Sequence, residues 1–482
     1  MKRILSVALV LLMIVALVGC GSKKREPIIL TLSTEDSEAI LNAAGVRLPE
    51  RETAAGADSS IIYLGTEDLM NNYSEDEIIN TGFWTFREKY GGSVIFEETT
   101  YDERFDKLAQ DVVGGSPPDF FSCGVSSEAT FPMYCINGSF QPVDKYVDYT
   151  DPLWEAMADA AEAFALGERH FAFVTDITFR NIVPYNRRVL EEYGYDDPAD
   201  LYYNDEWTWD VFYEMCMDFS DPDEDRYAID GYAYNGALVQ EATGRKIIHK
   251  DENGDYYAEM DDPYIEAAND LIYNLKKNEC VYHEGTNYWA GRNNHEEGAG
   301  TKDGLCLFYI TVFGNIQRPV AEMEAVWGDV TNHEFMFAPL PRYQNGDGEY
   351  YLASIPEGFM LVENARNPEG VALYAACDRF KRMDSVVMSI DKKQLKDKYL
   401  WTDEMLDMYD ECREIILKNS GMYLNGNLTD NVNNAYNAFR DKVARDSGAT
   451  SWAQVKEEYK DQLDYYLEEQ NDIIRDYIDS LG

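Results

Sequence analysis

Short apolar segments alternate with amphipathic ones from residue 61 onward, and this alternation is the sequence feature that most limits the possible folds. In the segment 102–113, Phe105, Leu108 and Val112 fall on one side of a helix, which indicates a helix that packs on a sheet. Strand and helix units that repeat with short connections are typical of βαβ topology, so we expect an α/β fold with mostly parallel sheets. The elements predicted in this region are strands at 61–64, 93–97 and 119–122 and helices at 75–90 and 102–113.

The rest of the chain adds further helices and one hairpin. Thr208 is a predicted N-cap, because its hydroxyl can accept a hydrogen bond from a backbone N–H of the first helical turn. Asn253-Gly254 is a typical turn between the two strands of a hairpin in 249–257. One or two amphipathic helices are predicted in 452–481. The other predicted helices are 152–166, 187–193, 208–219, 263–278, 368–383 and 402–419.

Length and charge narrow the class of protein. The chain has 482 residues, which is long for one compact domain, so two or more lobes are expected. The 35 tyrosines suit both core packing and contact with a polar ligand. The formal charge of −47 repels polyanions and excludes nucleic acid as a partner. This acidity could attract cationic solutes, although charge spread along a whole chain more often belongs to a solvated surface.

The first 22 residues have the layout of a secretory signal. A basic start at Lys2-Arg3 precedes an apolar run, and Leu17-Val18-Gly19-Cys20 resembles the bacterial lipobox, whose cysteine is acylated and becomes the N-terminus after cleavage. The alternative is a membrane helix with an incidental cysteine, but the run 4–18 is shorter than the roughly 20 apolar residues that span a bilayer. We therefore expect a signal peptide at 1–19 and an extracytoplasmic protein held at the cell membrane by lipid.

Residues 20–60 are rich in charged and small residues and are predicted to form a flexible lipidated tether. A short strand at 28–32 and a short helix at 37–44 are candidate elements within it. Seven cysteines follow Cys20, an odd number without CxxC spacing, which indicates buried thiols rather than a disulfide framework. A single bridge, such as Cys123 to Cys135, stays open as an alternative.

Seven segments, in chain order, carry the motifs of one family. The first four are 105–121 with Pro118-Asp119 before an apolar strand, 137–144 (NGSFQPVD), 184–195 (PYNRRVLEEYGY) and 207–212 (WTWDVF). The last three are 303–308 (DGLCLF), 337–341 (FAPLP) and 356–372 with PEGFML and NPEGVA. Together they resemble the extracellular solute-binding proteins of family 1, which serve carbohydrate ABC importers. The resemblance covers roughly 61–383, and it departs from the family at Arg187, where lysine is usual, and at Cys123, in an often aromatic neighbourhood.

The resemblance implies a two-lobed periplasmic-binding-protein fold of type II, in which the lobes close over a solute held between them. The lobes implied are 61–175 with 311–383 for lobe 1 and 176–310 with 384–482 for lobe 2. The crossings between them are expected at 174–183, 307–313 and 382–390. The ATPase and permease subunits of such an importer would be separate chains, because this one has no P-loop and no later stretch of 18 apolar residues. The expected partners are a small-molecule solute, the permease subunits and the membrane, with a monomeric chain and no cofactor.

Neutral sugars are bound by flat aromatic faces and by planar polar groups at loop ends, so such residues near the motifs are candidates for the cleft. Each has a packing role as its alternative: Tyr232 could fill the core, and Arg180 could pair with a carboxylate. Trp207 and Trp209 begin a helix and are predicted to be packing residues. The candidate ligand-binding residues are Cys123, Ser126, Asp176, Phe179, Arg180, Tyr232, Tyr234, Asn235, Trp289, Tyr309, Phe313, Trp327 and Glu357.

Two patterns are discounted as metal sites, and no metal or catalytic residue is predicted. Asp221-Pro-Asp-Glu-Asp225 has alternating carboxylates, but Arg226 stands where an EF-hand needs glycine, so a solvated turn is expected. His295-Glu296-Glu297 lacks the H-E-x-x-H spacing of a zinc site.

The main hypothesis is a binding lipoprotein, without enzymatic activity, that delivers a sugar or oligosaccharide to an importer. One alternative keeps the fold and changes the solute to a cation or a peptide. The other is a surface glycoside hydrolase, which would need two carboxylates about 5 to 10 Å apart with different roles. No motif in the sequence pairs such carboxylates.

Overall fold

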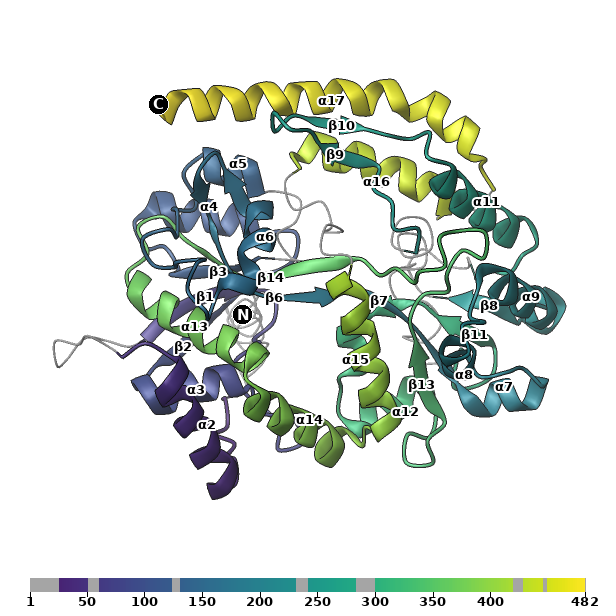
Figure 1. Ribbon diagram of the computed structural model, residues 1–482, viewed down its shortest axis with the longest axis horizontal. Coiled ribbons are helices and arrows are strands. Elements are labelled where there is room, and N and C mark those ends of the chain that lie inside the picture. Colours follow the sequence, from purple (N-terminus) through teal and green to yellow (C-terminus); the bar gives the residue numbers. More distant parts are fainter. Residues whose placement is uncertain are drawn as a thin grey trace, which may run out of the picture.

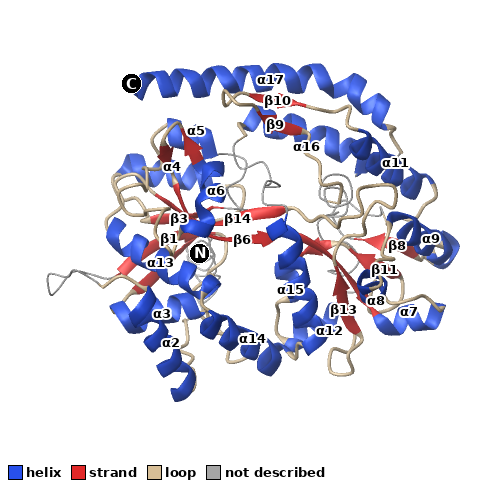
Figure 2. Ribbon diagram, viewed as in Figure 1, coloured by secondary structure: helices blue, strands red, loops and turns tan. Residues whose placement is uncertain are grey.

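The computed structural model describes residues 26–50, 60–123, 131–230, 242–282, 300–418, 428–444 and 449–481. Within these ranges the chain forms two α/β lobes side by side, with helices covering the strands of each lobe (Figures 1 and 2). None of the helices in these ranges is long and apolar enough to cross a membrane.

Lobe 1 is built on a five-stranded sheet in the order β2-β1-β3-β14-β6. β1 pairs in parallel with β2 and β3, whereas β14 runs antiparallel to both β3 and β6. The parallel βαβ part of the sheet is therefore confirmed, and β14 is a reversed strand inserted beside it. The strands are β1 (Ser60–Gly65), β2 (Ser93–Glu98), β3 (Phe120–Cys123), β6 (Ala172–Phe179) and β14 (Ser354–Leu361).

Asp119, in the Pro-Asp motif, has a structural role in lobe 1. Its side chain is fully buried and accepts hydrogen bonds from the backbone N–H groups of Ile62 in β1 (2.7 Å) and Asn367 (2.8 Å). Asn367 caps α13 (Pro368–Met383), the helix that packs against α3 and β6. A buried carboxylate with two backbone donors thus ties the first strand to the start of α13.

The helix predicted at 75–90 begins later, as α3 (Thr81–Tyr90). The carboxylate of Glu77 accepts a hydrogen bond from the backbone N–H of Tyr73 (3.0 Å), which holds this stretch in a turn. The side chain of Asn80 then caps the first turn of α3. Such local bonds between side chain and backbone compete with helix formation, and they explain the shorter helix.

Lobe 2 is organised around β7, which pairs antiparallel with β12 and with β13. Beside them β11 pairs in parallel with β8. The strands are β7 (Asn181–Asn186), β8 (Tyr227–Asp230), β11 (Cys306–Tyr309), β12 (Thr311–Val312) and β13 (Phe335–Ala338). The helices are α7 (Arg187–Tyr193), α8 (Pro198–Tyr203), α9 (Trp209–Phe219), α11 (Pro263–Lys277) and α12 (Val320–Trp327).

The start of α9 confirms two predictions. Thr208 is its N-cap, and its hydroxyl accepts a hydrogen bond from the backbone N–H of the first turn. Trp207 and Trp209 are buried, and their indole N–H groups donate to the carbonyl oxygens of Pro339 (2.9 Å) and Pro341 (2.8 Å). The two tryptophans therefore fasten α9 to the Ala-Pro-Leu-Pro turn.

The lobe boundaries implied by the sequence are wrong in two segments. The sequence places 384–482 in lobe 2, but α14 (Ser385–Tyr399) packs on α2 (Thr34–Arg47) and α13 of lobe 1. The sequence places 311–383 in lobe 1, but β12 and β13 join the sheet of lobe 2. The chain returns to lobe 1 only at β14, so the second crossing lies between Ala338 and Ser354 and not at 307–313. The reason is that a short apolar strand such as β13 fits either sheet, and its sequence does not say which strand it pairs with.

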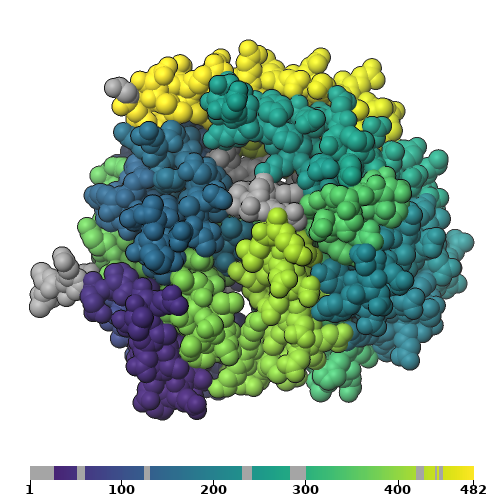
Figure 3. Space-filling model, viewed as in Figure 1, coloured from purple at the N-terminus to yellow at the C-terminus, as the bar shows by residue number. Residues whose placement is uncertain are grey.

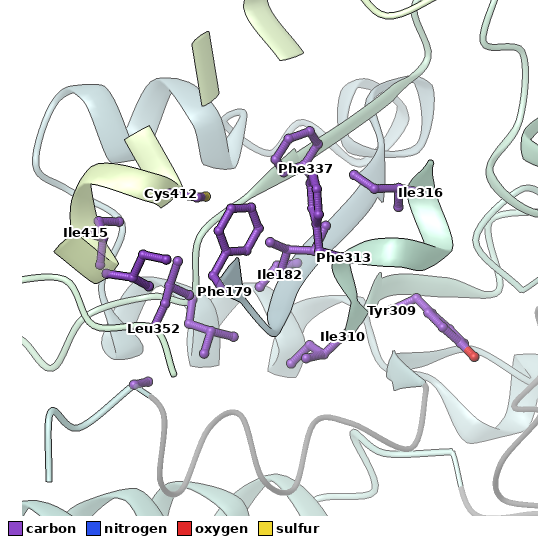
Figure 4. Packing of buried hydrophobic residues seen from close by; sticks show 14 of the residues in the cluster. Phe179, Ile182, Tyr309, Ile310, Phe313, Ile316, Phe337, Leu352, Cys412 and Ile415 are labelled. Atoms are coloured by element: carbon purple, nitrogen blue, oxygen red, sulfur yellow. The ribbon is translucent and has the colours of Figure 1, made fainter. Parts of the chain in front are cut away.

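The first crossing lies where it is predicted. β6 of lobe 1 and β7 of lobe 2 are separated only by Arg180. Phe179 and Phe313 pack there with ring centroids 4.5 Å apart, and Phe337 lies 6.0 Å beyond Phe313 (Figure 4). The third predicted crossing, 382–390, contains the junction between α13 and α14 (Ser385–Tyr399). Helix α14 then leads to α15 (Asp403–Lys418).

Part of the predicted tether is folded. α2 (Thr34–Arg47) begins after Ser33, whose hydroxyl accepts a hydrogen bond from the backbone N–H of Asp36 (3.1 Å). Ile40 and Ala44 on this helix are fully buried in the lobe 1 core. The compact fold therefore includes residues well before β1, and the short helix suggested within the tether is longer than predicted.

The helix predicted at 152–166 is broken into short turns. Its end is fixed by a small hairpin, in which β4 pairs with β5 across a turn at Gly167 with φ of +63°. A helix cannot continue into a residue that is already paired as a strand. The elements are η1 (Glu155–Met157), α6 (Ala158–Ala161), η2 (Glu162–Phe164), β4 (Ala165–Leu166) and β5 (Arg169–His170).

The predicted hairpin near residue 254 is confirmed, and the C-terminal segment forms a single long helix. β9 (Ile248–Lys250) and β10 (Tyr256–Ala258) pair antiparallel, with Gly254 at φ +90° in the turn. α17 (Trp452–Leu481) lies along this hairpin and along α16 (Asp430–Ala444), at the upper edge of Figure 1.

The seven cysteines from Cys123 to Cys412, all within the described residues, are buried thiols, as predicted, and the Cys123 to Cys135 bridge is not formed. Burial raises the pKa of both thiols, which keeps them protonated and unreactive.

Candidate functional site between the lobes

A cavity of about 450 Å³ opens where the lobes meet, and its volume falls in the usual range for small-ligand sites. The loop 67–80, which follows β1, forms its lobe 1 wall. Gly314, Gln317 and Arg318 reach it from lobe 2. Helix α14 of lobe 1 and helix α15, which contacts β6 of lobe 1 and β13 of lobe 2, complete the cavity. Their side chains there include Asp391, Lys392, Tyr399, Tyr409 and Arg413.

A second, smaller cavity of about 170 Å³ adjoins the first and reaches into lobe 1. It is lined by three strands, through Cys123 at the end of β3, Thr175 of β6 and Glu357 of β14. The residues that line both cavities are Leu69, Met70, Asn80, Lys381 and Arg382. The two cavities therefore form one candidate site with a shared wall.

The loop 67–80 is shaped mainly by Asp68. The Asp68 carboxylate accepts hydrogen bonds from the backbone N–H groups of Met70 and Asn71 (both 3.1 Å), and from the hydroxyl of Tyr73 (2.6 Å). Asn80 donates to the carbonyl oxygen of Leu69 (2.9 Å) and so closes the loop. These bonds fix the lobe 1 rim of the cavity, and both carboxylate oxygens of Asp68 are engaged as acceptors within the loop.

A buried charge cluster lies under the shared wall. Asp176 on β6 is 1% exposed, and it accepts hydrogen bonds from Arg413 of α15 (3.1 and 3.2 Å) and from Arg382 of α13 (3.1 Å). Burial alone would lower the pKa of Arg382, but the carboxylates of Asp378, Asp176 and Glu357 raise it above its ordinary value. Asp176 therefore joins lobe 1 to the joining helix α15.

Glu357 faces the smaller cavity because of the local backbone. The β14–β6 register shifts between Glu357 and Gly358. A Cβ atom on residue 358 would lie 1.8 Å from the carbonyl oxygen of Phe173, so only glycine fits there. This close approach explains the Pro-Glu-Gly motif, and it leaves the Glu357 carboxylate partly exposed, 3.7 Å from Arg382. Burial raises the pKa of Glu357, and the attraction of Arg382 opposes part of that rise.

The structure separates the predicted site residues into three groups. Cys123 and Glu357 line the smaller cavity, and Asp176 lies beneath it. Arg180 forms the first crossing, where its backbone N–H donates to the carbonyl oxygen of Ala353 (3.1 Å). The residues that fall outside the described ranges are Cys20, Ser126, Tyr232, Tyr234, Asn235 and Trp289.

Four predicted aromatic residues are core residues in this structure. Phe179 and Phe313 pack on each other and on Tyr409, at the crossing. Tyr309 and Trp327 pack edge to face in lobe 2, with ring centroids 5.4 Å apart. Protein atoms cover these four side chains, which are therefore core residues and do not line the cavity.

Sequence reasoning missed most of the cavity wall. Asn80, Lys381, Asp391 and Arg413 line it, yet they lie in helices or at helix starts that read as ordinary surface. The available signal was position alone: the loop after the first strand of a parallel sheet lies at the carboxyl edge, where ligands bind in α/β folds.

The Asp221–Asp225 segment is the turn that the sequence predicts. Arg226 forms an ion pair with Asp221 (3.3 Å), so a cationic side chain already compensates the charge of this carboxylate. Within the described ranges no cluster of His, Cys, Asp or Glu could hold a metal ion.

No protein-family model and no curated protein matches the sequence, whereas many solved structures match the fold. The binding protein for galacto-N-biose and lacto-N-biose I of an ABC transporter from Bifidobacterium longum, in complex with lacto-N-biose, superimposes with a TM-score of 0.59 and 13% identity, over 86% of this chain and 98% of that one. The GacH receptor of Streptomyces glaucescens, solved without ligand and with acarbose, has a TM-score of 0.55 and 15% identity, over 84% and 99%.

A third similar structure is the ABC transporter associated binding protein from B. animalis subsp. lactis in complex with β-1,6-galactobiose. It has a TM-score of 0.54 and 14% identity, over 86% of this chain and 98% of that one. These likenesses span nearly the whole of each structure, and they show that this chain has the two-lobed periplasmic-binding-protein fold.

Proposed function

We propose that this protein is a solute-binding protein, without enzymatic activity, that captures a sugar or oligosaccharide between its lobes and delivers it to the permease of an ABC importer. The observation that carries the proposal is the cavity at the lobe junction, which has walls from both lobes and from helix α15. A solute that touches both walls stabilises the arrangement in which they are close, which is the physical basis of lobe closure. The similar structures named above were solved with lacto-N-biose, acarbose or β-1,6-galactobiose, which supports this class of solute.

The chemistry of the wall suits a molecule with many hydroxyl groups. Glu357 and Asp391 are acceptors, Lys381 and Arg382 are donors, and Asn80 offers both kinds of group. Both acidic and basic side chains line the cavity, so neither a strongly cationic nor a strongly anionic solute is favoured by charge alone.

A thermal-shift screen tests the proposed solute. The chain from Gly21 onward would be heated with neutral mono- and oligosaccharides, with polyamines and with amino acids. A ligand that binds only the folded state raises the melting temperature, by an amount that grows with its concentration. We expect a saccharide to give the largest shift; a shift with polyamines and none with any saccharide would overturn the sugar assignment.

We propose in addition that the protein is anchored outside the cytoplasm through lipid on Cys20. The expected result is that Cys20→Ala releases the protein from cells into the medium, while the thermal shift with sugar is unchanged. Full retention of the variant at the membrane would contradict the anchor and leave the solute proposal standing.

A further inference from the structure

Exposed large apolar side chains gather on two neighbouring parts of lobe 1: the segment 26–50 with α2, and α14. Val46 is 86% exposed and Ile29 is 76% exposed, which is unusual for aliphatic residues in a chain this acidic. We call this surface the α2–α14 face. Its exposed apolar residues are Ile28, Ile29, Leu41, Val46, Val386 and Leu400. Leu69 of the loop 67–80 lines the cavity between the lobes and is not part of this face.

The two parts of the α2–α14 face are joined by direct contacts. Arg47 at the end of α2 pairs with Asp384 at the start of α14 (3.6 Å). Asp36 of α2 pairs with Lys393 of α14 (2.8 Å). The backbone N–H of Ile28 donates to the carbonyl oxygen of Asn72 in the loop 67–80 (2.7 Å). In Figure 3, α2 in purple and the green α14 lie at the lower edge, on the opposite side from α17 in yellow.

The α2–α14 face also contains the start of the described chain. From Cys20 to Glu26 there are six residue steps, which span at most about 20 Å even when fully extended. A lipid on Cys20 would therefore hold this face, and not the α17 side, against the bilayer. This step rests on the anchor proposed above.

We propose that the α2–α14 face lies on the surface of the phospholipid bilayer to which the protein is anchored. α14 carries Lys392, Lys393, Lys396 and Lys398, and three of these lysines pair with Asp410, Asp36 and Asp403. Much of the charge on α14 is thus compensated, although the whole chain carries −47. The segment 26–50 adds Glu26, Glu35, Glu38 and Glu50 to this face, so repulsion from anionic headgroups remains there. The favourable contribution comes from the apolar side chains, which gain by leaving water.

Contact through this face has a consequence for closure. α3, α13 and α14 are bound together in lobe 1, through bonds such as Thr81 to Asp391 (2.9 Å) and Ile79 to Gln394 (2.7 Å). Lobe 1 would therefore be the lobe held at the membrane, and lobe 2 would be the lobe that moves when solute binds.

Hydroxyl-radical footprinting of an anchored chain tests the proposal. The chain that begins at Cys20 would be coupled through that thiol to a maleimide-bearing lipid, in vesicles of phosphatidylcholine and phosphatidylglycerol; the seven other thiols are buried and do not compete. We expect side-chain oxidation of Val46, Leu41 and Val386 to fall by about threefold or more on coupling. Oxidation of Tyr465 on α17 and of Val113 on α4 (Arg104–Gly114), which are both exposed, should not change.

A pair of double variants provides the matched control. Val46→Asp with Val386→Asp should restore oxidation of Leu41 in the coupled chain, whereas Val113→Asp with Tyr465→Asp should leave its protection intact. Equal oxidation of both faces in the coupled chain would overturn the proposal. Protection of the same residues in the uncoupled chain, together with a dimeric mass by light scattering, would also overturn it, because a second copy would then be the occupant.

The coupling imposes the anchor chemically, so this result does not depend on lipidation in the cell. If the Cys20→Ala variant stays fully at the membrane but the coupled chain is protected, the anchor proposal fails and the inference about the face survives. If cells do lipidate Cys20 and the coupled chain is evenly oxidised, only the inference about the face fails.

Discussion

Asp176 combines the chemistry of a sugar ligand with a structural role. A carboxylate at the end of a strand near a crossing is a reasonable ligand for hydroxyl groups, and the sequence predicts it as one. In the structure both of its oxygens accept hydrogen bonds from guanidinium groups, those of Arg382 and Arg413. The buried position means that these bonds replace water, so the cost of losing them is high.

We expect Asp176→Asn to destabilise the protein by about 3 kcal/mol, because it removes the charge that two buried guanidinium groups share. Differential scanning calorimetry should show a melting temperature several degrees below that of the unchanged protein. Asp205→Asn is the matched control, since Asp205 forms a pair with Arg342 but is 70% exposed, and it should change the melting temperature little. Equal effects of the two variants would contradict the structural role of Asp176.

Asp391 gives the stability of the protein a pH dependence. Burial raises its pKa from 3.8 to about 6, against the attraction of Lys381 and a hydrogen bond from Thr81. The folded state therefore holds this proton more tightly than the unfolded chain. The stability that this provides is fully present below about pH 4 and is lost as the pH rises through about 6.

Asp391→Asn keeps the acceptor for Thr81 but removes the titration. We expect the variant to be more stable than the unchanged protein at pH 7.5, by about 1 to 2 kcal/mol after allowance for its partial exposure in the cavity. The difference should vanish near pH 4 when melting temperatures are compared across the range. Asp397→Asn, on the exposed side of the same helix, should show no such convergence.

Glu357 is the predicted ligand residue that the fold turns most directly toward the smaller cavity. If a solute hydroxyl donates to its carboxylate, Glu357→Gln replaces a charged acceptor by a neutral one and should weaken binding about tenfold. Isothermal titration calorimetry with the best sugar from the thermal-shift screen measures this. Glu155→Gln, on the exposed surface of lobe 1, should bind like the unchanged protein, and so should Glu357→Gln if the solute lies elsewhere.

At the scale of elements, the sequence predicts best where one local rule acts alone. α4 (Arg104–Gly114) follows its apolar spacing and ends at a glycine in left-handed conformation, Gly115, as the Gly-Gly pair suggests. The hairpin at 249–257 and the cap at Thr208 are likewise local. The turn at 73–80 was missed because it depends on a specific side-chain bond, and the partner of β13 was missed because pairing depends on a distant strand.

The difference between local rules and distant contacts also explains which site residues the sequence could predict. Glu357 could be found because its motif includes the glycine that a close backbone approach requires. Lys381, Asp391 and Arg413 could not, because their helices read as amphipathic surface and face the cavity only after α13, α14 and α15 have packed. A cavity between lobes is a property of the assembly of elements, and no single segment carries its signature.

Two adjacent residues of α2 test whether this helix belongs to lobe 1 or to a tether. Ile40 is fully buried against lobe 1, while its neighbour Leu41 is 39% exposed. Ile40→Ala should lower the free energy of unfolding by about 2 to 4 kcal/mol, because it leaves a cavity under the helix. Leu41→Ala should change it by less than about 0.5 kcal/mol. Urea denaturation compares the two; equal, small effects would mean that α2 belongs to a tether and not to the lobe.

At the scale of the whole molecule, α17 is placed to couple the lobes. Its middle is bound to lobe 2, where Asn471 both accepts from the backbone N–H of Tyr256 (2.8 Å) and donates to its carbonyl oxygen (2.9 Å). Its end extends over lobe 1 (Figure 1). There, a Cβ built on Gly167 of the β4–β5 turn would lie 3.8 Å from Ile478. Movement of one lobe away from the other would separate Ile478 from the β4–β5 turn.

Removal of residues 476–482 should therefore favour the separated arrangement of the lobes. Since only the fraction of molecules in the binding arrangement captures solute, the apparent Kd should rise by a few fold, as expected for loss of about 1 kcal/mol. Small-angle scattering of the solute-free protein should show a larger radius of gyration. Removal of 480–482 alone keeps Ile478 and should change neither quantity. If the longer truncation alters the melting temperature but leaves both the Kd and the radius of gyration unchanged, the end of α17 only stabilises its surroundings and does not couple the lobes.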